Sequence, residues 1–336
     1  MSQVESRSMN LMATNTPPTC VLRERIGEIE SAMGDLRDGG LADQLPLIFE
    51  LGRKYESVKA LSHEIEELYG SYDSGISKEE IEALARSVVQ LRSNLCAHLE
   101  PRFDQFFNDY HLQLATSKET MDKVFSVRHQ VYCRELGYEP ARADEKETDP
   151  YDDQSQHVLL TRKDAPDHGV GCIRTVFVDP TRDGTDRLPL EAVVTSFRSY
   201  NPAHAPRDRI CELSRLSLLS DLRGSSTEGG HNPLRLLVTL ALPLAGCVVG
   251  IRNKAALCYQ LCRPSLVKYL NTSFGPTLMP IGAPVEFHGK RVPTVIKMTN
   301  AFENMDLISS VFYHCIEKQL YPNTTPESRS TNLAKL

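Results

Sequence analysis

Apolar residues in the first third of the chain recur three and four positions apart, the spacing that places side chains on one face of a helix. One stripe follows a Ser77-x-x-Glu80 capping pattern and consists of Ile81, Leu84, Val88, Leu91 and Leu95. A second stripe, between residues 43 and 68, consists of Leu51, Tyr55, Val58, Leu61, Ile65 and Leu68. With a shorter helix at about 22–36, they predict an antiparallel helical bundle over residues 21–112.

From about residue 116 the pattern changes to that of a mixed α/β domain. A Thr116-x-x-Glu119 capping pattern precedes a helix, and apolar runs at 156–162, 170–178 and 210–218 are typical of strands, the first two pairing antiparallel. Further on, residues 255–261 predict a strand, 263–271 a helix and 284–298 a hairpin that turns near Gly289. Asn300 is expected to cap a last helix with an apolar face of Phe302, Met305, Phe312, Cys315 and Ile316. These elements predict a largely antiparallel sheet.

The most apolar segment, residues 236–251, is 16 residues long and contains Pro243. A helix needs roughly 20 residues to cross a bilayer, so a core helix is predicted, with Asn232 as N-cap and Pro233 as its first residue, and no transmembrane segment.

Length and charge limit the classes of function. The chain has 336 residues, which suggests about two domains, and its polar ends, 1–20 and 322–336, are expected to be disordered. A net charge of −6 argues against a general nucleic-acid binder. Nine cysteines without a CxxC pair, and no secretory signal, indicate free thiols and a cytoplasmic location.

Charged residues stand inside otherwise apolar strands, at Arg174, Glu212 and Arg215. A buried charge without a partner costs several kcal/mol, so we expect these groups to pair with one another or with the acidic stretch 147–153. Arg128 and Tyr132 lie four apart on one helix face and join the candidates. Two interpretations stay open, an ion-pair network that only fixes the fold and a catalytic site. In a regular strand Glu212 and Arg215 face opposite sides; a β-bulge would bring them to the same side.

Four motifs, in this order, resemble the acyl-homoserine-lactone (autoinducer) synthases: VRHQVYCRELGY, ETDPYD, GCIRTV and CELSRLSL. The details are more similar to two sister groups, the N-acyl amino acid synthases and the acyltransferases associated with the exosortase (PEP-CTERM) system. The resemblance covers about residues 117–300. It implies a GNAT-type N-acyltransferase fold, an α/β (α+β) domain with a mixed, largely antiparallel central sheet at 116–321, preceded by the helical bundle.

By position, the resemblance implies a catalytic cluster of Arg128, Asp149, Asp152, Arg174, Glu212 and Arg215. Tyr132 and Tyr138 stand where the synthases keep Phe and Trp, and this chain has no Trp, so an amino acid or another amine replaces S-adenosylmethionine as the expected acceptor. The implied reaction is direct transfer of a fatty acyl group from a thioester, on acyl carrier protein or coenzyme A, with no bound cofactor or metal. Glu212 is the expected general base, and His157 and Ser214 are further candidate substrate contacts, with a structural role as the alternative for His157.

The loop 223–232, ahead of the apolar helix, is the candidate site for the donor's phosphopantetheine arm, through Arg223, Gly224, Gly229 and Gly230; an ordinary glycine-rich connection is the alternative. An acidic carrier protein would need a basic patch, for which the candidates are Arg223, Arg252, Lys254, Arg263 and Lys268, or these residues are solvated surface. Cys133 and Cys211 adjoin the cluster and keep a thiol nucleophile open. The alternative from another class is a catalytically idle acyltransferase fold that senses lipid or acts as a scaffold through its N-terminal helices.

Overall fold

A computed structural model describes residues 17–36, 40–69, 76–179, 181, 186–223, 233–274, 278–298 and 305–323. The chain forms two compact units, Met1–Arg102 and Phe103–Leu336. The sequence predicts different domain limits, 21–112 and 116–321, and these remain a prediction. The predicted disordered ends lie outside the described residues, except that Pro18–Cys20 are helical and residues 322 and 323 form a turn.

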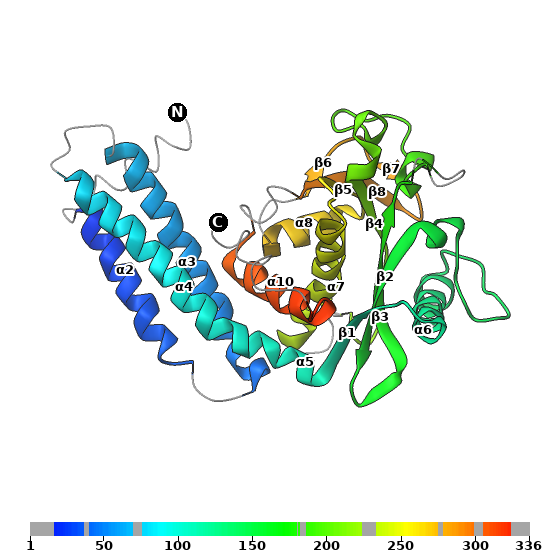
Figure 1. Cartoon of the computed structure of the whole chain (residues 1–336), viewed down its shortest axis with the longest axis horizontal. Coiled ribbons are helices and arrows are strands. Elements are labelled where there is room, and N and C mark those ends of the chain that lie inside the picture. The colour runs from blue at the N-terminus through cyan, green and yellow to red at the C-terminus, as the bar shows by residue number, and fades with distance from the viewer. Residues whose placement is uncertain are drawn as a thin grey trace. The chain divides into compact units, whose positions relative to one another are not determined.

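The first unit contains three long helices: α2 (Pro18–Met33), α3 (Leu41–Tyr69) and α4 (Lys78–Asp104), which continues into the second unit. They run alternately up and down (Figure 1). Both apolar stripes are buried as predicted, apart from the Leu68 side chain, which lies outside the described residues. Ser77 Oγ accepts a hydrogen bond from the Glu80 backbone N–H at 3.2 Å, which confirms the predicted helix start.

The helical region ends earlier than the sequence indicates. The short helix α5 (Phe106–Asp109) leads directly into β1 (Tyr110–Leu114), so residues 110–112 are strand, not helix. Phe103 and Phe106 pack against Phe312 of α10 (Leu307–Leu320), the first tilted and the second edge to face, with ring centroids 5.3 Å apart in both pairs. The aromatic residues of this segment therefore belong to the core of the second unit.

The sheet of the second unit has the strand order β1-β2-β3-β4-β5-β8-β6, and β7 pairs with β8. Only β4 and β5 run parallel; every other recorded pair is antiparallel, as the sequence predicts. The strands are β2 (Ser155–Arg162), β3 (Ala165–Phe177), β4 (Ile210–Leu218), β5 (Leu257–Cys262), β6 (Met279–Pro280), β7 (Val285–Glu286) and β8 (Lys290–Lys297). The predicted hairpin is β7–β8, and it turns at Gly289, whose φ of 84° favours glycine.

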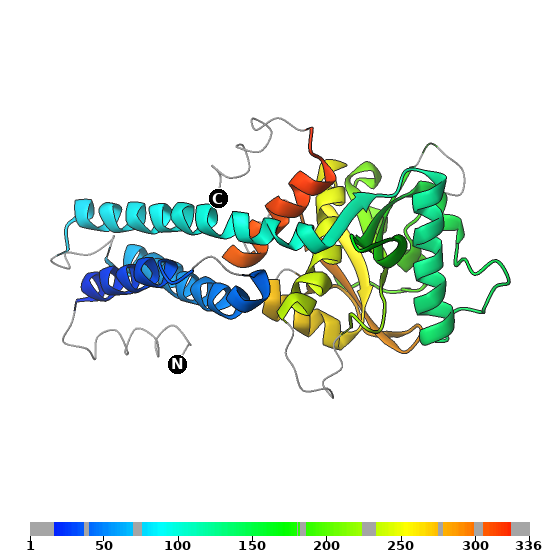
Figure 2. The ribbon, with the colours of Figure 1, turned by 90° about the horizontal axis from the view of Figure 1, so that it is seen from below.

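Helices cover both faces of this sheet. α7 (Pro233–Arg252) and α10 lie on one side, and α6 (Lys118–Arg128) lies on the other, as Figures 1 and 2 both show. α6 continues as a π-helix, η1, over His129–Glu135. α8 (Pro264–Phe274) follows β5. Gly246 lets α7 lie close to the sheet, because a Cβ there would be 2.7 Å from Leu213 Cδ2.

One predicted helix cap is wrong by one residue, and two others lie outside the described part of the chain. α6 is capped by Ser117, whose side chain accepts from the Thr120 N–H, not by Thr116 with Glu119. Asp306 caps α10, while the predicted cap Asn300 lies outside the described residues, as does Asn232 before α7. Ser117 is an ordinary capping residue, and sequence patterns place helix boundaries less securely than helices.

α7 is the helix expected to form the core. By length and composition alone, Leu234–Arg252 is apolar enough to cross a membrane. However, 67% of its most apolar window is buried inside the structure, against β2, β3, β4 and α10. This burial agrees with the predicted core helix, because a membrane span presents its apolar side chains to lipid.

Candidate active site

Strand β4 presents alternate residues to the two sides of the sheet. Cys211 and Leu213 face α7, where they approach Gly250 and Gly246. Glu212 therefore faces the other side, the side that α6 covers. The β3–β4 and β4–β5 registers pair Glu212 with Val176 and Tyr259.

Three further polar residues share this face. Arg174 lies opposite Ser214 on β4 and opposite His157 on β2. Directly paired residues have side chains on the same side of a sheet. The α6 side thus carries His157, Arg174, Ser214 and Glu212 across three strands.

A β-bulge brings Arg215 to the same side. The register moves from Cys172–Ser217 to Arg174–Ser214, so two residues of β4 stand opposite one residue of β3. Arg215 lies at the bulge with a φ of 51°, in the left-handed region. Its side chain meets Asp149, which also binds Arg174, and this shared partner fixes the side on which Arg215 lies.

Three arginines and three carboxylates then form one network. Arg128 binds Glu147 through Nε and Asp152 through Nη1, the latter at 2.6 Å. Arg174 binds Asp149 at 2.5 Å, Asp152 at 2.8 Å and Ser214 Oγ at 3.0 Å. Arg215 Nη2 lies 3.1 Å from Glu147 and 2.9 Å from Asp149. Five of the six predicted catalytic residues, all but Glu212, are therefore members, and Glu147 is a sixth.

The centre of this network is closed to solvent. Arg128 is 0% exposed, Arg174 1% and His157 2%. Burial would raise the pKa of Asp152, but Arg128 and Arg174 hold it at about 2. Burial lowers the pKa of His157 to about 4, so this ring is neutral at pH 7. Within the described part of the chain, both ring nitrogens of His157 and the Nη2 atoms of the two arginines lack a hydrogen-bond partner.

The network reaches the surface at Arg215 and Asp149, whose side chains are 17% and 18% exposed. Arg215 lies over the Tyr132 ring at 5.4 Å, and Tyr132 donates its hydroxyl hydrogen bond to the Leu216 carbonyl at 3.1 Å. The Tyr138 ring stacks on His288 at 5.0 Å. Of the predicted substrate contacts, Tyr132 and Tyr138 thus lie at the accessible edge, whereas His157 and Ser214 lie inward, against Asp152 and Arg174.

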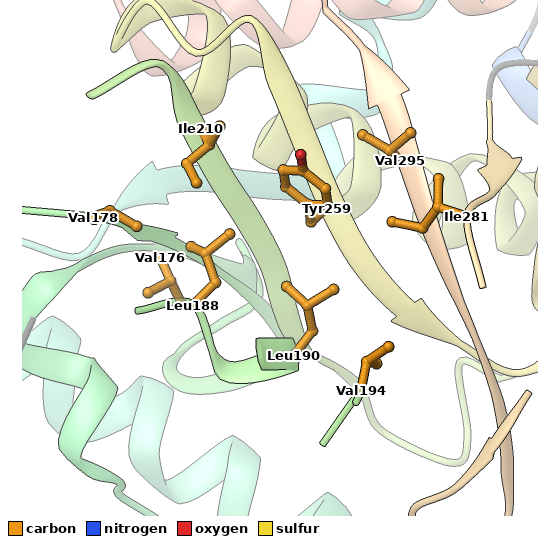
Figure 3. Packing of buried hydrophobic residues seen from close by; sticks show 9 residues of the cluster. All are labelled: Val176, Val178, Leu188, Leu190, Val194, Ile210, Tyr259, Ile281 and Val295. Atoms are coloured by element: carbon orange, nitrogen blue, oxygen red, sulfur yellow. The ribbon is translucent and has the colours of Figure 1, made fainter. Parts of the chain in front are cut away.

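Glu212 has a different environment from the network. It is 3% exposed, and its Oε2 accepts a 2.8 Å hydrogen bond from the Leu190 backbone N–H. Leu190 belongs to a single helical turn, η3 (Pro189–Ala192). Figure 3 shows Leu188 beside Val176 of β3 and Leu190 on the side toward Val194, in the same apolar cluster as Tyr259 of β5.

The pKa of Glu212 is raised to about 8 by burial. The Leu190 N–H, Arg174 and Arg215 lower it in part, but neither arginine forms an ion pair with it in the described structure. The expectation that Glu212 pairs with an arginine is therefore wrong, since Leu190 supplies its partner. A carboxyl group with this pKa can exchange a proton near neutral pH.

The surroundings of Cys133 and Cys211 do not favour a thiol nucleophile. Cys211 faces α7, on the opposite side of β4 from Glu212, and its pKa is raised by a hydrogen bond with Cys258 and by burial. Burial also raises the pKa of Cys133. Neither thiol is activated toward the thiolate form that attacks a carbonyl carbon. All nine cysteines lie in described segments, and none forms a disulfide.

The candidate donor site is described only in part. Gly224, Gly229 and Gly230 lie outside the described residues. Arg223 forms an ion pair with Glu135, and Arg252 of the candidate basic patch pairs with Glu317. A cavity of about 510 Å³ opens between α6 and the start of β3, but no candidate site residue lines it.

Sequence reasoning missed three residues around this site, Leu190, His288 and Arg291, and named Arg263 only as a candidate for a basic patch. Arg263 and Arg291 lie over the Tyr138 ring at 5.6 and 5.8 Å. Nothing in the local pattern of residues 257–263 or 284–298 marks these two as contacts of Tyr138, because a strand-end arginine is usually solvated surface. Leu190 acts through its backbone, which no side-chain motif reveals.

Comparison with known families identifies the class of protein. Residues 127–230, from the end of α6 through β4, match the family model of the acetyltransferase (GNAT) domain. The chain therefore carries a GNAT-type domain and is an acyltransferase. The predicted mixed α/β fold, with a largely antiparallel sheet after a helical region, is confirmed.

Several solved structures are similar in fold. The AHL synthase LasI is 17% identical, with a TM-score of 0.41, over 57% of this chain and 93% of LasI. The CoA-dependent acyl-homoserine lactone synthase BjaI, solved with SAM and isopentyl-CoA, is 16% identical, with a TM-score of 0.44, over 61% of this chain and 89% of BjaI. FeeM, an N-acyl amino acid synthase from uncultured soil microbes, is 10% identical, with a TM-score of 0.41, over 59% of this chain and 96% of FeeM. Such low identities assign no substrate to this chain. Among curated proteins there is no significant match.

Proposed function

We propose that this protein is an N-acyltransferase that moves a fatty acyl group from a thioester, on acyl carrier protein or coenzyme A, to the amine of an amino acid or a related small molecule. The observation that carries the proposal is the buried carboxyl group of Glu212, which lies on β4 shortly before the bulge. This group accepts one hydrogen bond and has a pKa of about 8. In this reaction a neutral amine attacks the thioester carbonyl carbon, the nitrogen loses a proton, and the thiolate leaves. No covalent enzyme intermediate is needed.

Glu212 is the general base of the proposal. An ammonium group must lose its proton before its nitrogen can attack, and a base is most effective when its pKa lies near the working pH. Because Glu212 is enclosed, we propose that the proton of the amine reaches it through a water molecule. Its pKa places a useful ionised fraction between pH 7 and 8.

The bulged part of β4 is the proposed holder of the thioester carbonyl. β4 pairs with β5 only from Ile210 to Leu213, although β4 continues to Leu218. Along residues 214–218, the described register therefore leaves the edge of β4 that faces β5 without a strand partner. Backbone N–H groups there can donate to the oxygen as negative charge develops during attack.

The arginine–carboxylate network is proposed to position these groups. Arg128 and Arg174 are closed to solvent and Asp152 is held by both of them, so we assign these three residues no contact with substrate. They hold Asp149, which with Glu147 fixes Arg215 at the bulge. Arg215 is the member of the network that can touch substrate. The predicted cytoplasmic location and the link to the exosortase-associated acyltransferases stay predictions.

Mass spectrometry of the reaction products tests this function. Purified protein is incubated with palmitoyl-CoA or palmitoyl carrier protein and a panel of amino acids and simple amines. We expect an N-acyl product with at least one pair, and none above background with Glu212→Gln. If no pair gives a product, or Glu212→Gln gives the wild-type yield, the proposal is wrong; an idle fold that only binds lipid would behave in the first way.

A further inference from the structure

A second group of cations lies beside the bulge and takes no part in the ion-pair network. Arg263 follows β5, Arg291 lies on β8, and both guanidinium groups lie over the Tyr138 ring. His288, from the hairpin turn, stacks on the same ring with its plane 16° from parallel. These four residues are the Tyr138 cluster.

The Tyr138 cluster lies on the same face of the sheet as Glu212. Tyr259 pairs with Val295 and Leu261 with Pro293, and Tyr259 and Val295 pack in the core on the side away from α7. Arg291 stands two residues before Pro293, and alternate residues share a side. Tyr138 itself follows the π-helix that extends α6.

Along the strands, the Tyr138 cluster is level with the bulge. Leu213 pairs with Gln260 in the parallel register, so Arg263 lies three residues further on, close to the level of Leu216. Arg215 lies over Tyr132, and the Tyr132 and Tyr138 ring centroids are 6.3 Å apart. Tyr132 thus lies between the cluster and Arg215, and a small molecule held by the cluster is next to the proposed site of acyl transfer.

The two cluster arginines keep donors for a carboxylate, although Arg291 Nη1 also donates to the Lys290 backbone carbonyl at 3.2 Å. Glu139, in the loop after Tyr138, is occupied by His288 at 3.5 Å and Arg215 at 3.6 Å, and Glu286 acts on Arg291 without forming an ion pair with it in the described structure. In the part of the chain that the structure describes, neither Arg263 nor Arg291 forms an ion pair with a carboxylate. Arg263 is exposed and Arg291 is half-buried, so both are accessible to a ligand. Guanidinium groups bind carboxylates through two parallel hydrogen bonds.

We propose that Arg263 and Arg291, held against Tyr138, bind the carboxylate of the acceptor, and that the acceptor is an α-amino acid and not a simple amine. In such a molecule the amine is bonded to the carbon next to the carboxylate, so anchoring the carboxylate directs the amine toward the bulge. The place of this site in the reaction rests on the proposed acyl transfer, but the binding itself does not. Arg128 and Arg174 are closed to solvent and cannot serve this purpose.

Calorimetric titration of the full chain without an acyl donor tests the site. The probes are the 20 common L-amino acids and, for each one that binds, its carboxamide. We expect at least one amino acid to bind and its amide to bind at least about tenfold more weakly, which is about 1.4 kcal/mol. Arg263→Gln and Arg291→Gln are each expected to weaken amino-acid binding by about tenfold or more.

The matched control is Lys290→Gln, which removes an exposed positive charge next to Arg291 but on the opposite side of β8. It should change the dissociation constant less than about twofold, as expected for a solvated charge. Titration with coenzyme A tests whether these arginines bind the phosphate groups of the donor and not the carboxylate of the acceptor. We expect Arg263→Gln to leave the binding of coenzyme A unchanged.

Four results would overturn the proposal: no amino acid binds at millimolar concentration, the amide binds as well as the acid, Lys290→Gln has the same effect, or Arg263→Gln weakens coenzyme A in place of the amino acid. Its failure and that of the proposed function are distinguishable. Amino-acid binding without acyl transfer rejects the function alone; acyl transfer to simple amines, unaffected by both arginine variants, rejects the site alone.

Discussion

The buried carboxyl group of Glu212 makes the stability of the folded protein depend on pH. Burial raises its pKa from 4.5 to about 8 in the folded state. The folded state therefore binds more protons than the unfolded state between these two values. Its stabilising effect is fully present below about pH 4.5 and is lost as the pH rises through about 8.

The size of this effect follows from the shift. One pKa unit corresponds to about 1.36 kcal/mol, so a rise from 4.5 to about 8 corresponds to about 5 kcal/mol in total. Of this, about 3 to 4 kcal/mol falls between about pH 5 and pH 8. Glu212→Gln keeps the size of the side chain and removes the titration.

The assay is urea unfolding of wild type and Glu212→Gln at pH 5 and pH 8, followed by the near-ultraviolet circular dichroism of the tyrosines. The other titrating groups are common to both proteins and cancel in the difference. We expect wild type to lose about 3 to 4 kcal/mol more than the variant between the two pH values. Parallel losses, within about 0.5 kcal/mol, would refute the reasoning, because Glu212 would then titrate as an ordinary carboxyl group.

Three further predictions concern packing and chemistry. Arg174→Met leaves the three carboxylates of the network with two arginines, so one negative charge is uncompensated, and it should lower the free energy of unfolding in urea by about 3–5 kcal/mol; a loss below about 1 kcal/mol would contradict the network. Gly246→Ala should destabilise the protein by about 1–3 kcal/mol in the same assay, because the added Cβ meets the sheet. Gly27→Ala, whose Cβ would have nothing within 4 Å, should stabilise it by about 0.5–1 kcal/mol. Equal effects of the two variants would contradict the packing. With a thiol reagent, exposed Cys20 should react first and buried Cys211 only on unfolding, as followed by mass spectrometry of peptides. The reverse order of labelling would contradict the fold.

Most of the fold is readable from the sequence because its periodicity is strong. The stripe from Ile81 to Leu95 and the strands at 156–162 and 170–178 appear where the pattern predicts them. The exceptions have physical causes. β1 follows a helix without a turn signal, and its strand character depends on pairing with β2, which is distant in sequence. The cap at Ser117 differs from the predicted one by a single residue.

The charged cluster is also readable, because buried charges require partners. The sequence pairs Arg174 and Arg215 with the acidic stretch 147–153, and the ion pairs confirm it. The bulge is harder to foresee, since an arginine with positive φ breaks the usual preference for glycine or asparagine. The partner of Glu212 is a backbone N–H from a separate loop, and that contact exists only in the folded chain.

The pH dependence of acyl transfer tests the central claim most directly. With an acyl donor and amine that yield product, kcat/KM is measured from pH 5.5 to 9 for wild type and Glu212→Gln. We predict that wild-type kcat/KM rises about tenfold per pH unit and levels off near pH 8, the pKa of Glu212, if the amine's own titration is corrected for. We predict that Glu212→Gln is about 10²- to 10⁴-fold slower at pH 8 and lacks this rise. A variant with the same profile and rate as wild type would contradict the role of Glu212 as general base.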